Sequence, residues 1–77
     1  MNLDAIGKNI ATIRKANHLT QVELASRLNV TPQAVSKWEN GVNLPETSLL
    51  VALSQLFQVT IDELLMNDPY KGNRIDG

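Results

Sequence analysis

Three residues separate two helix-forming segments near the middle of the chain, and this short spacing constrains the fold more than any other feature. Residues 20–23 have the capping-box pattern, in which a threonine hydroxyl and a glutamate three positions later satisfy free N–H groups at a helix start. Asn29 is suited to end this first helix of about eight residues, because asparagine tolerates a left-handed backbone. Thr31 followed by Pro32 begins a second helix, which we expect to run to about Asn40.

The connection over residues 29–31 is of the length that joins two helices at a steep angle in a helix-turn-helix. Helices that cross this closely need a small residue where their axes approach and an apolar residue that faces it. Ala25 and, ten positions later, Val35 meet these two requirements. Leu28 and Trp38 are placed to close the surrounding core, so we expect Trp38 to pack inward rather than to stack on a ligand.

Helix signals on both sides of this motif predict an all-α chain. Apolar residues recur at steps of three and four over residues 3–16, which is typical of an amphipathic helix. Its expected inward stripe consists of Leu3, Ile6, Ile10 and Ile13. The side chains expected to face elsewhere are those of Lys8, Asn9, Arg14 and Lys15. A strongly apolar segment over residues 49–57 and a second capping box at residues 60–63 add two helices, which completes a compact five-helix bundle.

The size and charge of the chain bound its partners. With 77 residues and no cysteine, it is expected to form one domain that is held by helix packing rather than by disulfides or thiolate-bound metal. The net charge of −1 argues against a nucleic-acid partner, since phosphates attract lysine and arginine. Five basic and three acidic side chains lie in residues 1–41, whereas two basic and five acidic ones lie in residues 42–77. The weakly positive half contains the predicted motif.

Several classes of function lack support in the sequence. His18 has no second histidine or carboxylate at ligand spacing, so we expect no metal site and no cofactor. No nucleophile with a base and no glycine-rich phosphate loop is present, which argues against an enzyme. No apolar run is long enough for a membrane span, and a cytoplasmic protein is expected. We assign residues 1–66 to the domain and residues 67–77 to a polar, flexible tail.

The outward side of the helix over residues 32–40 is the candidate functional surface. Its polar residues are Gln33, Ser36, Lys37 and Asn40. Glutamine can form two hydrogen bonds with one adenine, at its N6 donor and its N7 acceptor. Lysine can reach either the acceptors of guanine or a phosphate. Serine pairs with any base edge. The alternative is an ordinary solvated helix face.

Three sequence blocks resemble the Cro and phage-repressor type of helix-turn-helix, also called the xenobiotic-response-element family. They are LTQVELA at residues 19–25, VSKWENG at 35–41 and VTIDELL at 59–65, and the resemblance extends over about residues 3–66. It implies a lambda-repressor-like bundle whose third helix enters the major groove of double-stranded DNA, generally as a homodimer on a two-fold operator. It also implies that Arg14 and Glu39 form an ion pair.

The resemblance further implies a role for each candidate residue. Gln21 would bind a phosphate. Base edges would be faced by Gln33, Ser36 and Lys37, and on either side of them the DNA backbone would be contacted by Thr31 and Asn40. Two positions depart from the family pattern: Pro32 offers no base-reading group where some relatives have one, and Asn29 replaces a common glycine. The first hypothesis is therefore a sequence-specific transcriptional regulator, and more specifically a repressor. The alternative is an antitoxin or adaptor that uses the same fold to bind a partner protein.

Overall fold

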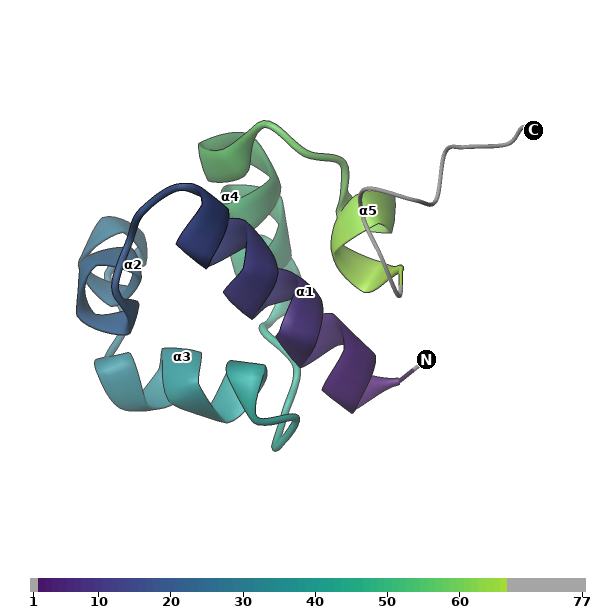
Figure 1. Ribbon diagram of the computed structural model, residues 1–77, viewed down its shortest axis with the longest axis horizontal. Helices are drawn as coiled ribbons and strands as arrows, with labels where there is room; N and C mark the ends of the chain where they lie inside the picture. Colours follow the sequence, from purple (N-terminus) through teal and green to yellow (C-terminus); the bar gives the residue numbers. More distant parts are fainter. Residues whose placement is uncertain (1, 67–77) are drawn as a thin grey trace.

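The computed structural model describes residues 2–66 as a bundle of five α-helices with no strand among those residues (Figure 1). The helices are α1 (Leu3–Ala16), α2 (Gln21–Leu28), α3 (Pro32–Glu39), α4 (Thr47–Phe57) and α5 (Ile61–Leu65). The predicted all-α, five-helix architecture is therefore confirmed. The tail predicted for residues 67–77 lies outside the described residues.

The predicted helix starts are confirmed by their capping bonds. The backbone N–H of Glu23 donates to the Thr20 hydroxyl at 3.0 Å, and the Thr20 N–H donates to the Glu23 carboxylate at 2.8 Å. The hydrogen bonds that the Glu23 carboxylate receives from Thr20, first of all from its backbone N–H, hold the pKa of Glu23 below its ordinary value. Residues 60–63 form the same reciprocal pair at the start of α5. Thr31 caps α3 by accepting from the N–H of Ala34 at 3.1 Å.

The helix ends rely on left-handed residues. Asn29 has a φ of 59°, as predicted, and Gly41 has a φ of 73° just after α3. After α1, His18 takes the left-handed conformation, with a φ of 59°. Gln58 ends α4 in the same way, although glutamine is not a residue type that signals this conformation. The α4 start at Glu46 lacks a side-chain capping bond.

One apolar core joins all five helices. α1 packs against α3 and α5, α2 packs against α3 and α4, and α4 packs against α5. In Figure 1, α3 lies along the lower edge of the molecule and α5 lies on the other side of α1. The buried core residues are Ile6, Ile10, Ile13, Leu24, Ala25, Val35, Trp38, Leu53, Phe57 and Leu64. Leu3, which was expected in the inward stripe, is 37% exposed because it stands in the first turn of α1, at the edge of this core.

Two polar residues of α1 were wrongly expected to face away from the core. Asn9 and Arg14 are 2% and 8% exposed. Asn9 is buried because its amide nitrogen donates to the Leu64 carbonyl at 3.0 Å and so fastens α5 to α1. Arg14 is buried because its guanidinium has three acceptors, which belong to the interface described below. Buried polar groups are tolerated when such partners satisfy them.

Gly7 permits a close backbone approach between α1 and the end of α3. A Cβ placed on Gly7 would collide with the Trp38 carbonyl oxygen and would lie 2.8 Å from the Glu39 carbonyl oxygen. Real Cβ atoms essentially never come this close to such atoms. No sequence pattern marks Gly7, because its requirement arises only from the packing of two distant segments. This approach positions α3, which carries the candidate interface.

Candidate nucleic-acid interface

The three-residue connection between α2 and α3 is present as predicted. Ala25 and Val35 are 1% and 0% exposed, so the small and the apolar residue both lie in the core. Within the turn, the backbone N–H of Val30 donates to the Ala25 carbonyl at 3.0 Å. Trp38 is 4% exposed, which confirms its packing role. The inward side of α3 is thus fully used by the fold, and its other side is free for binding.

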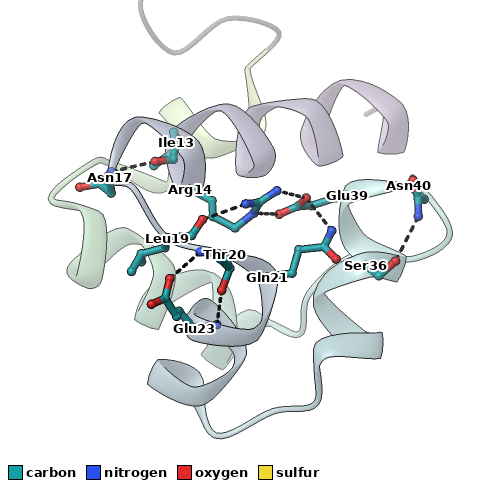
Figure 2. A network of polar contacts seen from close by, with 10 residues as sticks. All are labelled: Ile13, Arg14, Asn17, Leu19, Thr20, Gln21, Glu23, Ser36, Glu39 and Asn40. Atoms are coloured by element: carbon teal, nitrogen blue, oxygen red, sulfur yellow. Dashed lines mark hydrogen bonds and ion pairs between the residues drawn. The ribbon is translucent and has the colours of Figure 1, made fainter.

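The outward side of α3 presents polar side chains from successive turns. Gln33 and Lys37 are exposed, and Ser36 is half-buried. Asn40, at the C-terminal cap, is exposed and donates its amide N–H to the Ser36 hydroxyl at 3.2 Å (Figure 2). That hydroxyl retains its own hydrogen for an external acceptor. Thr31 is also exposed, at the other end of the helix. Five of the six predicted site residues therefore belong to α3 and its caps.

Arg14 and Glu39 form the ion pair that the resemblance implied. The Arg14 Nε donates to Glu39 Oε2 at 2.7 Å, and the second bond of the pair joins Nη2 to Oε1 at 2.9 Å. The remaining guanidinium nitrogen, Nη1, donates to the Leu19 carbonyl at 2.8 Å. The two charged side chains are only 10% and 6% exposed. The ion pair therefore fastens the end of α1 and the following loop to the end of α3.

The hydrogen bonds from Arg14 to Glu39 raise the pKa of the Arg14 guanidinium further above its ordinary value, and burial opposes this shift in part. Arg14 therefore stays charged and neutralises the carboxylate beside it. Removing one partner of a buried pair costs about 3 to 5 kcal/mol, because the other charge is left without compensation. An exposed pair would contribute far less.

Gln21, the sixth predicted site residue, lies apart from the outward side of α3. It opens α2, it is half-buried, and its Nε2 donates to Glu39 Oε1 at 3.0 Å. Figure 2 shows its amide nitrogen turned toward the carboxylate that also receives Arg14. This contact was not predicted from the sequence. Neither residue signals the contact alone. The hint lay in two features taken together: Gln21 stands at a predicted helix start and can donate, and Glu39 is a carboxylate expected near Arg14.

Few positive charges are available for phosphates. Arg14 is engaged with Glu39, whereas the other basic side chains in residues 2–66 are exposed. They are Lys8, Lys15, Arg27 and Lys37. Lys37 is the one that α3 itself carries. The interface consequently combines neutral hydrogen-bonding groups with a small number of cations.

The same part of the chain lacks the features of two other kinds of site. Histidine, cysteine, aspartate and glutamate residues form no group of three that could hold a metal ion within residues 2–66. None of α1 to α5 has both the length and the apolar character that crossing a membrane requires.

Comparisons with known proteins agree with this geometry. The helix-turn-helix family model matches residues 10–64. The HTH-type transcriptional activator BcrR of Enterococcus faecalis is 41% identical over 61 residues, which are 79% of this chain and 30% of that protein. The antitoxin PezA of Streptococcus pneumoniae is 35% identical over 63 residues, which are 82% of this chain and 40% of that protein. The chain thus spans less than half the length of these two relatives.

A solved structure gives the same result at the level of the fold. The crystal structure of the P22 c2 repressor in complex with a synthetic operator superposes with a TM-score of 0.76 and 33% sequence identity, and it covers 82% of this chain and 96% of that one. The three sequence blocks, the crossing of α2 and α3 and the family match all point the same way. The chain belongs to the Cro and phage-repressor type of helix-turn-helix family.

Proposed function

We propose that this protein is a transcriptional regulator that binds double-stranded DNA sequence-specifically and acts as a repressor. One observation carries the proposal: α3 buries Val35 and Trp38, while its opposite side exposes hydrogen-bonding side chains of the types that read base edges. A helix with these two sides, joined to α2 by a three-residue turn, fits the major groove. The P22 c2 repressor, a structural neighbour, is solved in complex with a synthetic operator, which supports a DNA-binding function for this fold.

The six site residues divide by what they would contact. The three residues within α3 itself would read bases, and the residues at its two caps and at the start of α2 would bind phosphates. The base-reading set is Gln33, Ser36 and Lys37, and the phosphate-binding set is Gln21, Thr31 and Asn40. Phosphate contacts fix the register of the protein on the duplex without reading sequence. Base contacts supply the specificity.

We also propose that the active form is a homodimer on a two-fold operator in the cytoplasm, without a cofactor and without catalytic activity. The small number of cations supports the dimer, because a monomer with few free basic side chains neutralises few phosphates. A second copy doubles these contacts and the number of bases read.

Selection of bound duplexes from a random pool, followed by shift assays at several salt concentrations, tests the proposal. A two-fold motif is expected to be enriched, and the logarithm of the affinity should fall linearly with the logarithm of the salt concentration. Replacing Gln33, Ser36 and Lys37 together by alanine should abolish the enrichment without unfolding the protein. Gln55→Ala, on exposed α4 surface, is the matched control. A wild-type protein that enriches no motif would refute sequence-specific binding.

A partner-binding function is the second candidate. The similarity to the antitoxin PezA and the net charge of −1 favour it. Under this alternative the wild-type protein and the triple alanine variant would bind DNA equally weakly at all salt concentrations. The same shift assays therefore separate the two candidates.

A further inference from the structure

Glu39 accepts a hydrogen bond from Gln21 in addition to its ion pair with Arg14. Its Oε1 accepts from both the Arg14 Nη2 and the Gln21 Nε2, at 2.9 and 3.0 Å. The Glu39 side chain is only 6% exposed, so these bonds are largely shielded from water. A carboxylate without a proton can only accept hydrogen bonds. The Gln21 amide must therefore turn its nitrogen, and not its oxygen, toward Glu39.

This orientation matters for the proposed phosphate contact. A phosphate oxygen also accepts hydrogen bonds, so Gln21 can bind it only through an N–H. The Gln21 Nε2 carries two hydrogens, of which Glu39 uses one and leaves the other free. Glutamine is a flexible side chain, and fixing it only when DNA arrives would weaken binding. The bond to Glu39 fixes it before DNA arrives.

The positive charge of Arg14 offsets the repulsion that a carboxylate would exert on nearby phosphates. An unpaired glutamate here would repel the phosphates that the interface is proposed to bind. Arg14 donates two hydrogen bonds to the Glu39 carboxylate, and its positive charge balances the negative charge of that carboxylate. The trio of Arg14, Glu39 and Gln21 is thus neutral overall and ends in one free N–H donor.

We propose that Glu39, with its charge balanced by Arg14, is a positioning residue that orients the Gln21 amide for a DNA phosphate. This inference rests on the proposed DNA-binding function and assigns Glu39 a role beyond fastening α1 to α3. Glu39 itself need not touch DNA.

A double-mutant cycle tests the inference with a duplex selected from the random pool. The four proteins are the wild type, Glu39→Gln, Gln21→Ala and the double variant. The amide introduced by Glu39→Gln would keep one acceptor oxygen, for which Arg14 competes, and Gln21 would lose its fixed orientation. Glu39→Gln should weaken binding about fivefold, the factor that corresponds to immobilising one long side chain on binding. In the Gln21→Ala background the same change should have an effect below about twofold.

Glu46→Gln is the matched control for charge. Glu46 precedes α4 and makes no side-chain capping bond, and its replacement removes the same negative charge from an exposed position. Loss of a negative charge alone strengthens attraction to DNA, so weakening by Glu39→Gln runs against the general electrostatic trend. An equal loss of affinity from Glu39→Gln in both backgrounds would mean that Glu39 acts only by bracing α1 and α3, and would overturn the inference.

A second test uses the wild-type protein without DNA, so it does not depend on whether any variant folds. NMR relaxation of side-chain amide groups should show Gln21 ordered relative to Gln33 and Gln55, which are exposed. A Gln21 amide as mobile as these two would overturn the inference. If the wild-type protein binds no duplex specifically, the proposed function fails. The order of the Gln21 amide in the free protein then still shows separately whether Glu39 orients that amide.

Discussion

Two glutamines stand in the first turns of α2 and α3, and their surroundings differ. Gln21 is half-buried and bonded to Glu39, whereas Gln33 is exposed on the outward side of α3. A helix-turn-helix places the first of its two helices across the DNA backbone and the second in the groove. The same side chain is therefore expected to have two different functions.

Gln33→Ala should relax the preference for one base pair in each half-site. Loss of a two-bond contact with a base should cost about 1 to 3 kcal/mol on the selected operator and little on a variant that already lacks that base. Affinities for the operator and its single-base variants, measured at one salt concentration, provide the test. An equal loss on all duplexes would show that Gln33 does not read sequence.

Gln21→Ala should weaken binding to every duplex by a similar factor and leave the preferred sequence unchanged. The reason is that phosphates are the same at every base pair, so a phosphate contact carries no sequence information. Repeating the selection from the random pool with this variant provides the test. A changed motif would contradict the assignment of Gln21 to the backbone.

The direction of side chains on α3 was predictable from the sequence, whereas the bond between Gln21 and Glu39 was not. Helical periodicity alone places Val35 and Trp38 on one side and Gln33 and Lys37 on the other. The bond depends on how the start of one helix meets the end of another, and no local pattern carries that information.

Helix ends show the same limit for whole elements. Thr20, Thr31 and Thr60 were identified as caps because each makes its bond within three residues along the chain. The left-handed end at Gln58 was missed, because glutamine adopts that conformation only when packing requires it. Asn9 was missed for a related reason. Its acceptor, the Leu64 carbonyl, lies 55 residues away.

The contact between α1 and α3 leaves no room for a side chain at Gly7. Gly7→Ala gains about 1 kcal/mol of helix propensity but introduces a methyl group against backbone carbonyl oxygens, and overpacking of this kind costs about 1 to 3 kcal/mol or more. We expect overpacking to dominate, because backbone atoms yield less easily than side chains. Each 1 kcal/mol lost should lower the Tm by about 4 to 8 °C in a domain of this size.

Thr12→Ala is the matched control for Gly7→Ala. Thr12 lies in the same helix, is exposed, and gains helix propensity without a new contact. Thermal unfolding of both variants by circular dichroism provides the comparison. A Gly7→Ala protein as stable as the Thr12→Ala protein would show that α1 and α3 have room to separate.

For the intact complex, a two-fold binding site has a defined geometry. The α3 helices of two copies must enter the same side of the duplex, so the half-sites should be centred about 34 Å apart or at a multiple of that distance. Sedimentation of the complex should give two protein chains for each operator. A single chain on an asymmetric site would contradict the proposed homodimer.

The ion pair between Arg14 and Glu39 also affects how the molecule opens. Its partners are 25 residues apart, and the segment between them contains all of α2 and nearly all of α3. Gln21 at the start of α2 and Arg14 both bind Glu39 at the end of α3, so we expect the unfolding of either helix to cost these bonds. Backbone amides in both helices should then exchange hydrogen with solvent at a common free energy of opening. Within residues 2–66, the five-residue α5 receives one side-chain bond from another helix, that from Asn9, and it should exchange faster. The helix-turn-helix would then behave as one cooperative unit that reaches its binding conformation all at once.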